Sequence, residues 1–302
     1  MAPHTKSVMQ VARALSDQLW QEAHTYLPAI EHGDTARLDP ALVACWQEAL
    51  RVQQCDPPHP KRFQRFQLPE PFAGYGGTER CAPPKLLVVG ANPGFRDDQV
   101  FPRWGCRGPT ARDRYFEFFW AAFAMCHRSG QTPEGVPVAR IEDPVLSWSD
   151  PITHYANVER AVGPGVLSNR CWQVDALPWK SAHLRLYKRG LRKPPPRDTL
   201  ALRLLDVQPL VQRRIAGALQ AIRPLDGARH ALVLGRDAAK LLGLPWHGRS
   251  ESGWCWELLH EGRDVETGPV RALVVMHPAW GWSRGQRERI QMLVRPVLER
   301  DT

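Results

Sequence analysis

One short stretch, residues 85–95, constrains the fold of this 302-residue chain more than any other. It reads KLLVVGANPGF, an apolar run that stops on a turn made of glycine, asparagine and proline. Such a run, bounded by turn residues, predicts a buried strand of a parallel sheet. Because ligands of open α/β sheets bind in the loops after the carboxyl ends of the strands, the turn predicts a binding site. An ordinary strand-to-helix turn would give the same pattern.

The composition predicts a globular chain without a membrane segment. With 43% hydrophobic and 24% charged residues, the chain is long enough to bury a core. No apolar run approaches the roughly 20 residues of a membrane span, and residues 1–19 lack the apolar block of a signal peptide. We therefore expect a cytoplasmic protein with no membrane partner.

The charge balance makes nucleic acid the first partner to consider. The formal net charge is +9 and the isoelectric point is near 9.5. Most of the cations are arginines, which suit phosphate contacts. A compositional explanation stays open, because the whole chain is rich in arginine, alanine, proline and tryptophan, as a GC-rich coding sequence would produce. The sequence indicates no obligate protein partner.

The seven cysteines are scattered and form no Cys-x-x-Cys pair, which argues against a disulfide framework and a zinc site. An iron–sulfur cluster would need ligands from four distant positions. We therefore expect mostly buried thiols, no metal and no cofactor.

Strand and helix patterns alternate after residue 85. This alternation predicts an α/β fold, in which three layers (α/β/α) surround a mainly parallel, four-stranded sheet. The predicted strands cover residues 85–90, 171–175, 230–235 and 271–278, the predicted helices cover 199–222, 236–242 and 284–299, and a hairpin arm is predicted at 252–261.

Two more helices, at 8–26 and 40–52, are predicted from apolar residues at helical spacing. We interpret residues 1–84 as an N-terminal helical extension with a linker, which packs against the sheet domain or covers its edge. Residues 85–302 then form the second domain, which carries the site.

Polar side chains lie at the carboxyl ends of three predicted strands. Asn92 follows the first strand, Asp175 ends the second and His277 follows the last. The carboxyl ends of parallel strands meet at one edge of a sheet, so these three residues are expected to surround one ligand.

At these positions the chain resembles the uracil-DNA glycosylase superfamily. Residues 90–94 (GANPG) resemble the first motif of its thymine-DNA and single-strand-selective branches. Residues 232–242 (LVLGRDAAKLL) resemble a strand, glycine and helix typical of the superfamily, and residues 277–285 (HPAWGWSRG) are similar to its His-Pro-Ser motif. The resemblance covers roughly residues 85–300 and leaves the first 84 residues outside it.

The resemblance implies a monofunctional DNA glycosylase that flips a base into a pocket and hydrolyses its N-glycosidic bond, leaving an abasic site. In this reading a neutral His277 donates a hydrogen bond to the departing base, and Asn92 orients the attacking water. Gly90 and Ala91 line the base pocket, and Phe95 stacks on the base. His277 as a core histidine and Phe95 as plain packing remain open alternatives.

Asp175 departs from the asparagine that several relatives carry at the end of this strand. An ionised carboxylate only accepts hydrogen bonds, so it suits the exocyclic amine of cytosine better than a carbonyl of uracil. The hypothesis is therefore excision of a modified cytosine, such as glucosylated hydroxymethylcytosine in viral DNA, as anti-phage defence. The alternatives are a uracil or deaminated-base repair glycosylase with Asp175 out of register, and a non-catalytic nucleic-acid-binding module of the same fold.

Further residues are predicted to contact double-stranded DNA. Relatives carry a wedge after the histidine motif, and here Trp280, Trp282 and Arg284 occupy that region. Two tryptophans separated by one glycine would equally make a packed corner. The predicted phosphate contacts are Lys180, His183, Arg185 and Arg236.

Overall fold

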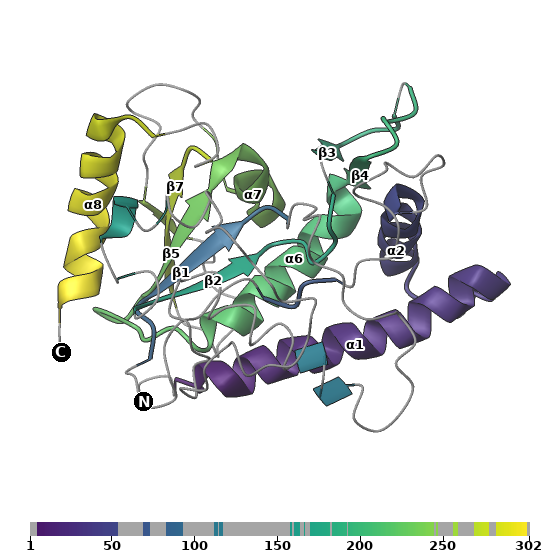
Figure 1. Cartoon of the computed structure of the whole chain (residues 1–302), viewed down its shortest axis with the longest axis horizontal. Coiled ribbons are helices and arrows are strands. Elements are labelled where there is room, and N and C mark those ends of the chain that lie inside the picture. The colour runs from purple at the N-terminus through teal and green to yellow at the C-terminus, as the bar shows by residue number, and fades with distance from the viewer. Residues whose placement is uncertain are drawn as a thin grey trace, which may run out of the picture.

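The structure, a computed structural model, describes most of the predicted elements. The described residues are 5–53, 69–72, 83–92, 112–113, 115–116, 158, 160–163, 166, 170–181, 183–191, 193–244, 246, 256–258, 269–277 and 282–300. Figure 1 shows a sheet at the centre of these residues, with helices around it.

The central sheet has five strands in the order β2-β1-β5-β7-β6. Four of them run parallel, which confirms the predicted mainly parallel sheet. These are β1 (Leu86–Gly90), β2 (Cys171–Asp175), β5 (Arg229–Leu234) and β7 (Val270–Val275). The short strand β6 (Trp256–Leu258), inside the predicted hairpin arm, pairs antiparallel with β7.

Alternate residues of the sheet face two separate apolar cores. In β1, Leu87 and Val89 belong to the larger core, whereas Leu86 and Val88 belong to the smaller one. Successive side chains of a strand point to opposite faces, so a strand that is apolar throughout needs cover on both sides. The larger core is closed by α1 (Val8–His32), α2 (Pro40–Gln53), α6 (Leu204–Leu219) and α7 (Gly235–Leu242), and the smaller one by α8 (Arg284–Glu299).

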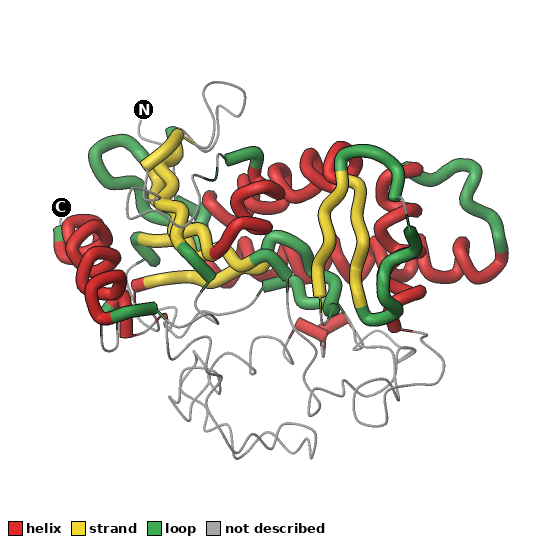
Figure 2. The backbone as a smooth tube through the Cα atoms, turned by 90° about the horizontal axis from the view of Figure 1, so that it is seen from above, coloured by secondary structure: helices red, strands yellow, loops and turns green. Residues whose placement is uncertain are grey.

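These two cores make the three-layer α/β/α arrangement. Figure 2 shows the strands with α8 on one side and the larger group of helices on the other. Lys85 ties the layers together, because its Nζ donates to the carbonyl of Leu298 at 2.9 Å and to that of Arg300 at 2.9 Å. The carbonyls at the end of α8 therefore receive the partners that a helix terminus needs.

The N-terminal helices share the larger core with the sheet. α1 begins at a capping box between Ser7 and Gln10 and ends at Gly33, whose φ of 74° lies in the left-handed region. Trp46 of α2 is fully buried in the same core as Trp172 of β2. The described part of residues 1–84 therefore packs against the sheet domain. None of the described helices is long and apolar enough to cross a membrane.

The single helix predicted at 199–222 is wrong in its first five residues. Thr199–Arg203 form β4, which pairs in parallel with β3 (His183–Tyr187) in a separate two-stranded sheet, and the helix α6 begins only at Leu204. A short apolar run fits a strand and a helix equally well, and here pairing with β3 and packing on α2 decide for a strand.

Candidate functional site at the carboxyl edge of the sheet

Gly90 and Asp175 meet at the ends of β1 and β2, where the strand register pairs them. The pairing continues past the strands, because the amide of Ala176 donates to the carbonyl of Gly90 at 2.9 Å. A Cβ atom at position 90 would lie only 2.0 Å from Oδ1 of Asp175. The glycine therefore makes room for the carboxylate of Asp175, a residue that is only 8% exposed.

Asn92 is held by a short chain of hydrogen bonds. Its Nδ2 donates to Oγ of Ser181 at 2.9 Å, and that hydroxyl donates to the carbonyl of His183 at 2.8 Å. The side-chain amide of Asn92 is therefore fixed in orientation at the carboxyl edge. Sequence reasoning did not find Ser181, because it belongs to none of the recognised motifs.

His277 follows β7 and packs against Gly235, the first residue of α7. A Cβ atom at position 235 would lie 3.0 Å from Cβ of His277, and Gly235 has a φ of +90°. Burial lowers the pKa of His277 below its usual 6.5, although the charge of Asp237 acts in the opposite direction. The lowered pKa favours the neutral imidazole of His277 near pH 7.

The three predicted residues lie along one edge of the sheet. In the order β2-β1-β5-β7, Asp175 and Asn92 follow neighbouring strands, whereas His277 lies two strands beyond β1. Neighbouring strands are about 4.8 Å apart, so His277 stands roughly 10 Å from the end of β1. Phe95 and Trp280, which were predicted to stack on the base and to wedge the duplex, lie outside the described residues.

Two predicted DNA contacts are wrong. Lys180 is buried, with its Nζ 3.2 Å from Oε1 of Glu70 and its side chain 2% exposed, so it has no surface to offer a phosphate. Trp282 is 5% exposed, and its Nε1 donates to the carbonyl of Met276 at 2.9 Å. This tryptophan is the packed corner rather than the wedge.

The other predicted DNA contacts that the structure describes are exposed: His183, Arg185, Arg236 and Arg284. Nε2 of His183 lies 3.7 Å from Asp198, and Arg284 pairs with Glu288 at 2.7 Å. Their role in DNA binding stays a prediction.

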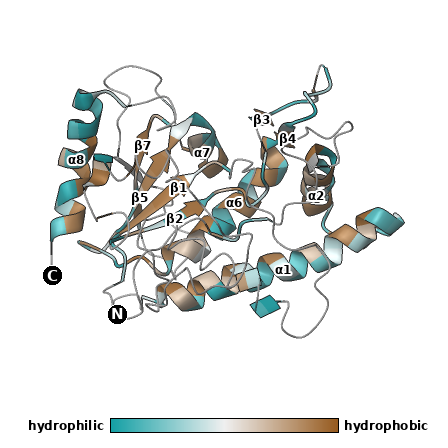
Figure 3. Ribbon diagram, in the orientation of Figure 1, coloured by the Kyte–Doolittle hydropathy of each residue, from teal (hydrophilic) through white to brown (hydrophobic). Residues whose placement is uncertain are grey.

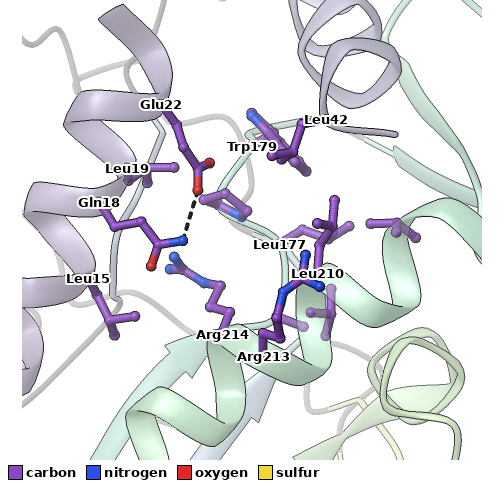
Figure 4. Close-up of a pocket in the computed structure, with 14 residues that line it drawn as sticks. Leu15, Gln18, Leu19, Glu22, Leu42, Leu177, Trp179, Leu210, Arg213 and Arg214 are labelled. Carbon is purple, nitrogen blue, oxygen red and sulfur yellow. Dashed lines mark hydrogen bonds between the residues drawn. The ribbon is translucent and has the colours of Figure 1, made fainter. Parts of the chain in front are cut away.

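A cavity of about 280 Å³ lies between α1, α6 and the segment that follows Asp175. Figure 4 shows Gln18 and Glu22 of α1 facing Arg214 of α6 across it. Burial raises the pKa of Glu22 above its usual value. Because neither Asn92, Asp175 nor His277 lines this cavity, it is not the nucleobase pocket that the sequence predicts.

Arg214 connects this cavity to the candidate site. It lines the cavity, its Nε donates to the carbonyl of Asp175 at 3.4 Å, and its Nη2 donates to the carbonyls of Glu70 and Pro71. These bonds hold the backbone at the end of β2 in place.

The described residues contain no group of three or more histidine, cysteine, aspartate or glutamate side chains placed to hold a metal. Cys45 and Cys171 are buried, as predicted for small apolar residues. Burial raises the pKa of the Cys45 thiol to about 12, which makes it a poor nucleophile.

No protein-family model matches the chain, and no curated protein matches it either.

Gly90→Ala is expected to lower the free energy of unfolding by about 1–3 kcal/mol, because the added methyl group overlaps Oδ1 of Asp175. Removing that oxygen in Gly90→Ala/Asp175→Ala should recover most of the loss. Denaturant unfolding of the single and double variants measures the coupling between the two positions. Gly190→Ala is the matched control, since a Cβ there meets nothing within 4 Å. Strictly additive losses at 90 and 175 would contradict the described contact.

Proposed function

We propose that the chain is a monofunctional DNA glycosylase, which turns a base out of the duplex, hydrolyses its N-glycosidic bond and leaves an abasic site. The observation that carries the proposal is the placement of Asn92, Asp175 and His277 along one carboxyl edge of a parallel sheet. Each of the three is held by a specific neighbour: Ser181, Gly90 and Gly235 respectively.

His277 suits stabilisation of the departing base. Negative charge develops on a carbonyl oxygen of the base as the glycosidic bond breaks, and a fixed hydrogen-bond donor lowers the energy of that state. A neutral imidazole donates from one ring nitrogen, and the lowered pKa of His277 favours the neutral form. Its contact with Gly235 also places it at the N-terminus of α7, where the helix dipole favours negative charge.

Asn92 suits the orientation of water. Because Nδ2 donates to Ser181, the amide plane is set, and the carbonyl oxygen of the side chain is the group that accepts a hydrogen bond from the attacking water. The sugar carries oxocarbenium character in the transition state of such reactions, so a weakly activated water suffices and no covalent carboxylate is needed.

Asp175 supports a cytosine-type substrate. β2 ends at Asp175, opposite Gly90, and this register favours the carboxylate as the base-reading group over a shifted alignment. An ionised carboxylate accepts from the exocyclic amine of cytosine and repels the O4 carbonyl of uracil. Since ordinary cytosine must be spared, we propose a modified cytosine in viral DNA as the substrate and anti-phage defence as the role.

Mass spectrometry of the bases released from duplexes containing uracil, cytosine, hydroxymethylcytosine or its glucosylated form tests this function. We expect release from modified cytosine only, and a loss of about 100-fold in release rate in Asn92→Ala and in His277→Ala, with DNA binding retained. His24→Ala, at an exposed histidine of α1, is the control and should release the base at the wild-type rate.

Two results would contradict parts of the proposal. Release of uracil alone would remove the modified-cytosine substrate and favour a repair enzyme. A wild-type protein that binds DNA but releases none of the bases would favour a non-catalytic binding module.

A further inference from the structure

A basic arm, residues 183–203, projects from the fold beside the candidate site. It consists of β3, the loop 188–198 and β4. Figure 1 shows the arm beyond the arrowheads of β1 and β2, on the side to which their carboxyl ends point, and Figure 3 shows its loop as hydrophilic. Asp198 is the one acidic residue in this stretch of sequence.

Four exposed cations of the arm have no carboxylate within ion-pairing distance among the described residues: Arg185, Lys188, Arg189 and Lys193. The exposed arginines of α8 differ, because Arg284 pairs with Glu288 and Arg295 with Glu299, each at 2.7 Å. Within the described part of the chain, no carboxylate therefore neutralises the charge of these four side chains.

The root of the arm is fixed to the body. Arg51 of α2 donates from Nη2 to the carbonyl of Thr199 at 2.6 Å, and Oε1 of Glu48 accepts from the amide of Ala201 at 2.7 Å. At the other strand, Ser181 links the carbonyl of His183 to Asn92. The cations are thus carried on a supported element that begins at the candidate site.

The spacing of the exposed side chains on β3 suits a nucleic-acid backbone. His183 and Arg185 are both exposed on β3, and residues two apart on a strand are roughly 6.6 Å apart. One strand of duplex DNA carries a phosphate about every 3.4 Å along the helix axis, so this distance corresponds to about two phosphate steps. Leu184 and Leu186, between and after them, pack against the larger core.

An anionic membrane fits the arm less well. Membrane-surface segments combine cations with exposed apolar anchors. The exposed large apolar side chains among the described residues are Leu205 and Met292, and both lie outside the arm.

We propose that the basic arm binds the sugar-phosphate backbone of duplex DNA next to the flipped nucleotide. This inference rests on the proposed glycosylase function and extends it, because it assigns the positioning of the duplex to Lys188, Arg189 and Lys193 as well as to Arg185. Contacts of this kind fix the register of a protein on DNA and carry no base preference.

The test is the salt dependence of binding. Fluorescence anisotropy with a labelled 20-base-pair duplex, between about 50 and 200 mM NaCl, gives the slope of log K against log salt concentration. Replacing these four cations by glutamine (Arg185→Gln, Lys188→Gln, Arg189→Gln, Lys193→Gln) should reduce the magnitude of this slope by about 3–4, since each phosphate contact contributes about 0.9.

The matched control removes the same formal charge from the other end of the molecule. It carries Arg287→Gln, Arg289→Gln, Arg295→Gln and Arg300→Gln, on α8 and at its end. The control should change the slope by less than about 1. Circular dichroism checks that both variants are folded.

The outcomes separate the arm from the glycosylase activity. An unchanged slope in the arm variant contradicts the proposal that the arm binds DNA. An equal decrease of the slope in the α8 control contradicts it as well. So does binding of the wild type to phosphatidylserine vesicles with no binding to DNA. If the wild type releases bases and the arm variant binds DNA normally, the proposal for the arm is wrong and the glycosylase proposal stands. If the wild type binds DNA through the arm and releases no base, the glycosylase proposal fails alone.

Discussion

Glu70→Gln is expected to lower the free energy of unfolding by about 3–5 kcal/mol, because it leaves the ammonium group of Lys180 buried without its carboxylate. The side chains of Lys180 and Glu70 are 2% and 6% exposed, and 3.2 Å separates Nζ from Oε1. Moving a charge out of water is costly when its opposite charge is removed. Urea unfolding of both proteins at pH 7 measures the difference.

The reciprocal and double variants make this prediction specific. Lys180→Met should lower the free energy of unfolding less than Glu70→Gln does, because the positive charge of Arg214 still interacts with the carboxylate of Glu70. Glu70→Gln/Lys180→Met, which removes both charges, should recover most of the stability. At an exposed ion pair, Glu288→Gln should leave unfolding unchanged. Equal effects of Glu70→Gln and Glu288→Gln would refute the buried pair.

Acidification is expected to remove about 3 kcal/mol of stability through His230 alone. Burial and the neighbouring charge of Arg271, directly opposite on β7, lower the pKa of His230 from 6.5 to about 4. In the unfolded chain the same imidazole takes up a proton near pH 6.5. Between these two values only the unfolded state is protonated, so the free energy of unfolding falls as the pH falls from 6.5 to 4.

Unfolding curves collected from pH 8 to pH 4 test this prediction, with His230→Gln as the comparison. The variant should lose most of the pH dependence, and a smaller slope should remain because the pKa of His277 is lowered as well. If His230→Gln follows the wild-type profile, another group titrates and the prediction fails.

The sequence predicted the fold correctly where one short pattern of residues defines an element. The four parallel strands are largely apolar runs bounded by turn residues, a pattern that favours a sheet covered on both faces. The same logic predicted that Asn92, Asp175 and His277 share one edge, since the ends of parallel strands meet there. The stretch 199–203 failed because nothing local separates a short buried strand from the first turns of a helix.

The sequence did not predict the contacts between distant segments of the chain. Lys180 was predicted to contact phosphate because its partner, Glu70, lies far earlier in the chain and carries no motif. Trp282 was predicted to be a wedge by its place after the histidine motif, yet its indole packs in the smaller core. Ser181, which holds Asn92, and Gly235, which seats His277, became visible only through their contacts.

Two glycines, Gly90 and Gly235, set the positions of Asp175 and His277 without contributing a functional group. A mutational scan restricted to polar and charged residues would therefore overlook both of these positions. Variants of the carboxylate should therefore be made together with variants of the glycine that faces it, since a side chain at position 90 would overlap Oδ1 of Asp175.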